Sequence, residues 1–148
     1  MGVNPAIAGR AYPPARVYEV GREKIAEFAA AIGSSDPAYL DPEAARALGH
    51  PDVVAPPTFA IIVAQRAEAA IVQDPEAGID YSRVVHGEQR FTHHRPITAG
   101  DRLVATASID AVRSVAGNDM LTTRVDLATE DGEPVCTATS MLVARGTA

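Results

Sequence analysis

Histidines are the side chains of this sequence best suited to proton transfer near neutral pH, because an imidazole can both accept and donate a proton there. Three of the four, His86, His93 and His94, stand in one segment, and the fourth is His50. On a strand, His86 and His94 would share one face, about 27 Å apart, while His93 points to the other. That spacing excludes one shared metal ion, and no compact set of His, Cys and Asp indicates a metal site.

Asp36 is the carboxylate that could best work with an imidazole. It precedes Pro37, however, and Asp-Pro commonly opens a turn, so a turn role is favoured. His50 follows Gly49, a predicted helix end, where a capping or loop role is favoured over catalysis. The single cysteine, Cys136, lies in an alternating strand pattern and is expected to be a buried or half-buried structural residue.

The composition excludes several classes of function. A net charge of -6 without a basic cluster argues against nucleic-acid binding. No apolar run approaches the roughly 20 residues of a membrane span. Residues 1–12 lack the features of a signal peptide, so a cytoplasmic protein is expected. The length of 148 residues predicts a single domain over residues 1–148.

A long helix predicted at Ala55–Val72 organises the chain. Pro56 and Pro57 open it, and a proline in the first turn loses no helical hydrogen bond. The stretch Phe59–Ala64 is apolar on every side, so this half of the helix needs cover all round. The β-rich stretch of residues 84–144 could supply that cover by curling around the helix.

Shorter elements are predicted before this helix. Residues 1–15 carry three prolines and indicate an irregular lead-in, and a short strand is expected within Arg16–Val20. Apolar spacing predicts an amphipathic helix at Arg22–Ile32. A second, short helix is predicted at Pro42–Leu48, with Asp41 as its N-cap.

After the central helix, the hydrophobic period changes to two. Four strands are predicted: Val84–His94, Arg102–Arg113, Met120–Thr129 and Pro134–Ala144. The second strand would place one row of side chains on a common face: Leu103, Ala105, Ala107, Ile109 and Ala111. Helices followed by a run of strands indicate an α+β architecture, here an antiparallel sheet wrapped around one long helix.

Several strings of residues carry a family resemblance: Tyr18–Ile25, Asp41–Ala45, Ala55–Phe59, His86–Phe91, His93–Ile97 and Gly100-Asp101. With them the chain resembles the MaoC-like (3R)-hydroxyacyl dehydratases and (R)-specific enoyl hydratases. It is most similar to the N-terminal MaoC-type dehydratase module and to small actinobacterial dehydratase subunits. The resemblance implies a hot-dog fold, an acyl-CoA or acyl-carrier-protein thioester as ligand, no cofactor, and a homodimer or heterodimer.

The resemblance also implies where an active site would lie. In the family, an Asp and a His five residues later transfer protons, and a backbone N–H at the start of the central helix polarises the thioester carbonyl. Here Ser34 stands at the Asp position and Tyr39 at the His position, while Pro57, without an N–H, replaces a glycine. Neither hydroxyl readily replaces a general acid or base at neutral pH.

Other residues are expected to contact a ligand without reacting. Tyr39, Pro57, Thr58 and Phe59 stand near the start of the central helix. Gln89 could bond a partner subunit or a pantetheine arm, although a structural role is favoured for it. Small side chains along the helix leave room for an apolar tunnel: Ala60, Ala64, Ala67 and Ala70.

Three functions stay open on the sequence. The first is a substrate-binding dehydratase subunit whose MaoC-like partner supplies the Asp and the His. The second is a self-sufficient hydratase homodimer that uses Asp36 and a histidine of the long strand. The third is an acyl-thioester binding module without chemistry. A thioesterase is less favoured, because the carboxylate of the central helix, Glu68, lies on its far half. Exposed sheet edges favour an oligomer in each case.

Overall fold

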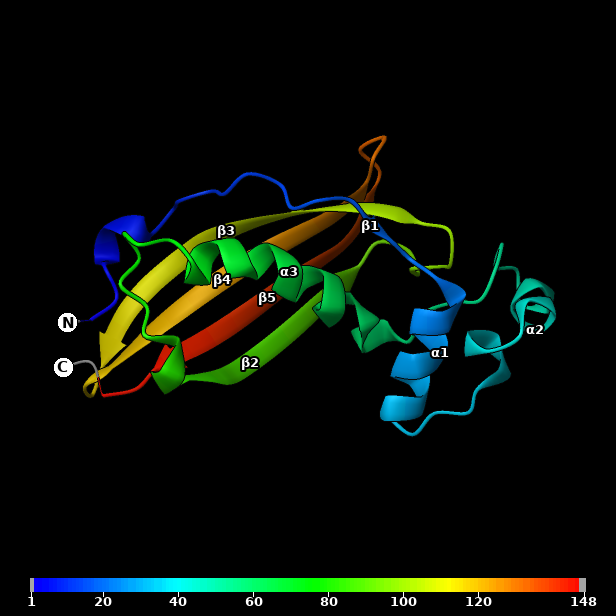
Figure 1. Ribbon diagram of the computed structural model, residues 1–148, viewed down its shortest axis with the longest axis horizontal. Helices are drawn as coiled ribbons and strands as arrows, with labels where there is room; N and C mark the ends of the chain where they lie inside the picture. Colours follow the sequence, from blue (N-terminus) through cyan, green and yellow to red (C-terminus); the bar gives the residue numbers. More distant parts are fainter. Residues whose placement is uncertain (1, 147–148) are drawn as a thin grey trace.

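Residues 2–146 are described by the computed structural model of this chain, and they form a long helix packed on a curved antiparallel sheet (Figure 1). The elements in chain order, with η for one turn of 3₁₀ helix, are η1 (Pro5–Ile7), β1 (Tyr18–Glu19), α1 (Arg22–Ala31), η2 (Pro37–Tyr39), α2 (Pro42–Ala47), η3 (Pro57–Phe59), α3 (Ala60–Val72), η4 (Tyr81–Arg83), β2 (Val84–His93), β3 (Arg102–Val115), β4 (Asn118–Thr129) and β5 (Pro134–Ala144). Figure 1 shows α3 across one face of the sheet, with α1 and α2 beyond the sheet near the start of α3.

The sheet has five strands in the order β1-β3-β4-β5-β2, and every neighbouring pair is antiparallel. The predicted α+β arrangement of a sheet around one long helix is confirmed. Asp41 caps α2 as predicted, accepting a hydrogen bond from the Glu43 N–H at 3.0 Å. Gly33 and Gly49 follow α1 and α2 with φ of 75° and 95°, the left-handed conformation in which glycine ends a helix.

The α-helical part of the central helix begins later than the sequence pattern indicates. Residues Pro57–Phe59 form the 3₁₀ turn η3, and regular α-helix starts at Ala60. Pro56 and Pro57 have no N–H, and their fixed φ suits this tight first turn. The first N–H groups at this end are therefore those of Thr58 and Phe59, and Phe59 donates to the Pro56 carbonyl at 2.9 Å.

The main core lies between α3 and the inner face of the sheet. Ala60, Ala64 and Ala67 are almost fully buried there, together with Val63 and Ile71. These three alanines let the helix approach the sheet closely, so they fill the core and do not line the predicted tunnel, while the fourth, Ala70, is half-buried. The opposite side of α3 is less covered than predicted, because residues 61 and 62, both isoleucines, are only half-buried.

A β-bulge at Gly87 changes which side chains of β2 face the helix. The register runs from His86 opposite Leu142 to Glu88 opposite Met141, so the alternation of faces reverses at the bulge. His93 lies opposite the buried Cys136, and cross-strand partners share a face. His86 and His93 therefore share the helix-facing side, which corrects the prediction that they point to opposite faces.

A second bulge between Ile109 and Ala111 has the same effect on β3. Leu103, Ala105, Ala107 and Ile109 are buried as predicted. Beyond the bulge, Val112 and not Ala111 packs against the core. The predicted common face therefore ends at Ile109, because the extra residue of the bulge shifts the alternation by one position.

The lead-in before β1 runs along the outer edge of β3. The N–H groups of Gly9, Tyr12 and Ala15 donate to the β3 carbonyls of Ile109, Ala107 and Ala105 at 2.7, 2.9 and 2.9 Å. The segment is irregular, as predicted, yet its backbone groups are paired. This edge of the sheet is therefore covered, and none of residues 2–146 pairs with the outer edge of β2.

Candidate functional site

A cavity of about 420 Å³ lies at the start of the central helix, and we call it the helix-start cavity. Its polar walls are Tyr39 of η2, His50 after α2, and the segment His93–Arg95 at the end of β2. Its apolar walls are Val54–Pro57 and Pro96–Ile97. Three of the four histidines thus meet Tyr39 and Pro57, two of the residues that the sequence predicts for ligand contact.

Tyr39 is held at the cavity by the turn η2, whose N-terminal end is capped by Asp36. The Asp36 carboxylate accepts a hydrogen bond from the Ala38 N–H at 3.0 Å and caps this turn. Asp36 is exposed and is not a wall of the cavity, so its observed role is the predicted turn role. Ser34 also lies outside the cavity walls, and its hydroxyl accepts from the Asp36 N–H at 3.4 Å.

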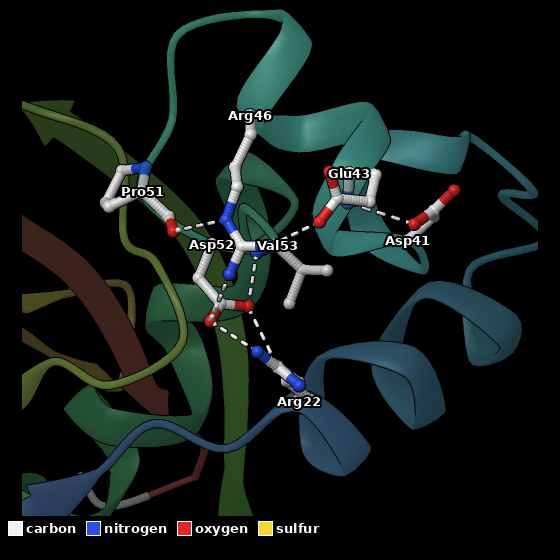
Figure 2. A network of polar contacts seen from close by, with 7 residues as sticks. All are labelled: Arg22, Asp41, Glu43, Arg46, Pro51, Asp52 and Val53. Carbon is white, nitrogen blue, oxygen red and sulfur yellow. Dashed lines mark hydrogen bonds and ion pairs between the residues drawn. The ribbon is translucent and has the colours of Figure 1, made fainter.

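Ion pairs hold the wall that follows α2 (Figure 2). The Asp52 carboxylate binds the Arg22 guanidinium in a bidentate arrangement, at 2.9 Å from Nε and 2.8 Å from Nη2. Arg46 of α2 donates to the Pro51 carbonyl at 3.3 Å and to Glu43 at 2.7 Å. The hydrogen bond from Arg22 lowers the pKa of Asp52 to about 2, so this carboxylate stays charged at neutral pH. The pairs fasten residues 51–53 to α1 and α2.

Backbone hydrogen bonds join this wall to the turn η2 and to the segment that follows β2. The Val54 N–H donates to the Ala38 carbonyl at 3.0 Å, and the Ala55 N–H donates to the Ile97 carbonyl at 2.7 Å. The cavity is therefore built from segments that are bonded to one another.

His93 connects the end of β2 to the first turn of the central helix. Its Nε2 lies 2.9 Å from the Pro57 carbonyl oxygen. Because a carbonyl only accepts, Nε2 carries the proton of this bond, and Nδ1 is left for another partner. His94 is exposed at the same rim, and His50 is half-buried. The backbone N–H of His50 donates to the Ala45 carbonyl at 3.1 Å, in keeping with the predicted capping role.

Arg95 supplies the positive charge of the cavity wall. Its guanidinium binds the Asp101 carboxylate at 2.9 and 3.0 Å and also Glu133 at 3.1 Å. The hydrogen bond with Asp101 raises the pKa of Arg95 further above its ordinary value. The walls thus present a phenol, imidazoles and one anchored cation, and none of the described wall residues is a carboxylate.

The remaining predicted contact residues lie elsewhere. Phe59 is fully buried, with its ring 5.6 Å from that of Phe28 and 6.4 Å from that of Tyr18. Its ring therefore belongs to the core, which corrects the expected ligand contact. Thr58 is exposed outside the cavity walls. Gln89 lies within the sheet, where its amide donates to the Thr139 carbonyl at 3.2 Å, a structural contact.

Sequence reasoning missed His50 as a neighbour of the two strand histidines. The position of His50 after a helix-ending glycine indicates its local backbone conformation. It does not indicate which residues from distant parts of the sequence lie near it. Among residues 2–146, no group of three or more His, Cys, Asp or Glu side chains could hold a metal ion. Within the same range, every helix is too short or too polar to cross a membrane.

Comparison with known proteins identifies the family to which the chain belongs. The sequence matches the family described as "FAS1-like, dehydratase domain region" over residues 6–138. The fold is that of a MaoC-like dehydratase, with a TM-score of 0.88 and 34% identity over 95% of this chain, which spans 42% of that protein. The chain therefore belongs to the MaoC-like hot-dog (3R)-hydroxyacyl dehydratase family, as its sequence motifs indicate.

Three individual proteins are similar to this chain over nearly its whole length. The chain is 37% identical to one in the C-terminally truncated HadBC (3R-hydroxyacyl-ACP dehydratase) complex of Mycobacterium tuberculosis, with a TM-score of 0.83 over 93% of this chain and 96% of that one. A UPF0336 protein of Saccharopolyspora erythraea is 59% identical over all 148 residues and 95% of its own length. A similar protein of Streptomyces griseus is 57% identical over 98% of this chain and 97% of its own.

Proposed function

We propose that this chain is the substrate-binding subunit of a (3R)-hydroxyacyl-thioester dehydratase. One observation carries the proposal: the helix-start cavity is intact, yet its described walls contain no carboxylate to pair with an imidazole. Tyr39 lines the cavity, while Ser34 lies outside its walls. Without the carboxylate, the chain retains a place for the ligand but lacks one member of the proton-transfer pair.

The proposed ligand is an acyl chain joined by a thioester to CoA or to a carrier protein. The cavity volume of about 420 Å³ lies within the usual range for small-molecule sites. Val54, Ala55 and Ile97 offer apolar contacts, and Tyr39 offers a hydrogen bond to an oxygen of the ligand.

The proposed partner is a second hot-dog subunit bound along the outer edge of β2. The lead-in covers the β3 edge, whereas the β2 edge has no partner among the described residues. An edge strand offers free N–H and C=O groups to a strand of another chain. Val85 on this strand is 40% exposed, which adds apolar area. The similarity to a chain of the HadBC complex supports a partner of this type.

Hydration of crotonyl-CoA tests the proposal. The assay compares this chain alone, a MaoC-like protein of the same genome with an intact Asp and His, and their co-expressed mixture. We expect activity to need the partner and to increase on addition of this chain. Appreciable hydration by this chain alone would contradict the proposal.

A second candidate is a self-sufficient hydratase, favoured by the convergence of His50, His93 and His94 on one cavity. Asp36 caps η2 outside the cavity walls, so the missing carboxylate would have to come from a second copy of the chain. Under this alternative the purified chain alone hydrates crotonyl-CoA, and H93N lowers the rate.

A further inference from the structure

A buried carboxyl group lies on the half of α3 that is remote from the helix-start cavity. Glu68 is only 6% exposed, and its Oε1 lies 3.1 Å from the hydroxyls of both Thr123 and Ser140. These hydroxyls belong to β4 and β5. The ionisable groups that share its cavity of about 320 Å³ are His86 of β2 and Tyr81 of η4. None of the ion pairs among the described residues involves Glu68.

Counting protons in this cluster shows that one is missing if Glu68 is ionised. Ser140 Oγ lies 2.6 Å from Gln89 Oε1 as well as 3.1 Å from Glu68 Oε1. The orientation of the Gln89 amide is determined, because its nitrogen donates to the carbonyls of Thr139 and Arg90 at 3.2 and 3.3 Å. A serine hydroxyl has a single proton, and the shorter contact to Gln89 takes it. The contact between Ser140 and Glu68 then needs a proton from Glu68.

We infer that Glu68 is a neutral carboxylic acid whose Oε1–H donates to Ser140, while Thr123 donates to the same oxygen. Hydrogen bonds then run without a break from α3 to the edge strand β2, through Glu68, Ser140 and Gln89. The inference depends on these contacts alone and is independent of the proposed enzymatic role.

The surroundings of Glu68 agree with a protonated carboxyl. Burial raises the pKa of Glu68, and this effect outweighs the hydroxyls of Ser140 and Thr123 and the charge of His86, which lower it. An ionised oxygen at this place would face a lone pair of Ser140, or would draw the Ser140 proton away from Gln89. The first arrangement brings two acceptor oxygens together, and the second leaves the half-buried Gln89 oxygen without its donor, so both are unfavourable.

The sign of the pH effect follows from the raised pKa. Between the unfolded pKa of a glutamate, about 4.3, and the higher folded value, the folded state binds more protons than the unfolded state. Stability therefore falls as the pH rises through this window. Each unit by which the pKa is raised corresponds to about a tenfold loss in the folding equilibrium constant.

Denaturant unfolding as a function of pH tests this inference with two variants. E68Q stays neutral and can still donate to Ser140, so we expect it to gain stability relative to the wild type as the pH rises above about 4.3. E23Q changes an exposed glutamate of α1 and should follow the wild type. Parallel curves for E68Q and the wild type, or a relative loss of stability by E68Q, would overturn the inference.

Infrared spectroscopy of the folded wild-type protein tests it without depending on a variant's stability. At pH 7 exposed carboxyl groups are ionised, so a C=O stretch of a protonated carboxyl should report a buried neutral acid. We expect this band in the wild type and in E23Q and its loss in E68Q. Its absence from the wild type at pH 7 would show that Glu68 is ionised.

Discussion

Tyr39 and His93 reach the helix-start cavity for different physical reasons. Tyr39 is carried there by a 3₁₀ turn that Asp36 caps, and His93 is bonded to the carbonyl of Pro57. A proline at this place cannot donate an N–H, yet its carbonyl still accepts a hydrogen bond. Pro57 therefore anchors the imidazole of His93 through its carbonyl, although it has no N–H to donate.

Replacement of His93 tests this anchor. We expect H93A to lower the free energy of unfolding by about 0.5–1.5 kcal/mol, the net value of one hydrogen bond. H94A is the matched control, since His94 is exposed at the same rim and its ring makes no hydrogen bond among the described residues. Its effect should stay within about 0.5 kcal/mol. Equal effects in a denaturant titration would show that the Pro57 bond adds nothing.

The reactivity of Cys136 provides a second prediction at this scale. Burial raises the pKa of its thiol to about 11, so the reactive thiolate is nearly absent at neutral pH. We expect a thiol-alkylating reagent to modify Cys136 only in denaturant, as measured by mass spectrometry of the intact chain. Rapid modification of the folded protein would contradict the buried position.

Among the elements, α1 and α2 position the cavity wall although neither belongs to it. The Arg22–Asp52 pair joins α1 to the segment after α2, as Figure 2 shows. Local sequence signals predicted both helices and the Asp41 cap, because capping and turn chemistry act over a few residues. The pair itself joins residues far apart in the sequence, and no local pattern indicates it.

Removal of the Asp52 charge should therefore loosen this wall. We expect D52N to lower stability at neutral pH by about 1 kcal/mol, near the upper limit for a pair with a solvent-exposed arginine. Because the pKa of Asp52 is lowered to about 2, its contribution is present above the unfolded pKa and disappears as the pH falls towards 2. D52N and the wild type should thus converge in acid.

Urea titrations at several pH values measure this effect. E27Q is a suitable control, because Glu27 makes a single exposed contact with Lys24 within α1. Its cost should stay below about 0.5 kcal/mol. A constant difference between D52N and the wild type at every pH would contradict an electrostatic origin.

At the scale of the whole molecule, the two edges of the sheet differ. The lead-in occupies the β3 edge, and the β2 edge is open along the described chain. The sequence indicates an oligomer through exposed edges in general. Only the folded arrangement shows which edge is available, because the lead-in has no strand pattern of its own.

A charge placed on β2 tests the proposed interface. V85E should weaken association with a hot-dog partner at least about tenfold, a loss of about 1.4 kcal/mol. V115E is the matched control, since Val115 is similarly exposed, 45% against 40%, but lies at the end of β3. Analytical ultracentrifugation of the co-purified complex measures both. Equal weakening by the two variants would place the interface elsewhere.

Local patterns are sufficient to predict the helices and the long strands, their order and the family, because hydrophobic periods, caps and glycine stops are local and the motifs are contiguous. The sequence also indicated that Tyr39 and Pro57 stand where catalytic groups are expected. Which side chains lie close together depends on the three-dimensional fold. Bulges at Gly87 and after Ile109 reverse the faces of β2 and β3, since one extra residue shifts an alternation of two. The fold also placed Phe59 in the core and brought His50 to the strand histidines, because packing between distant segments sets those positions.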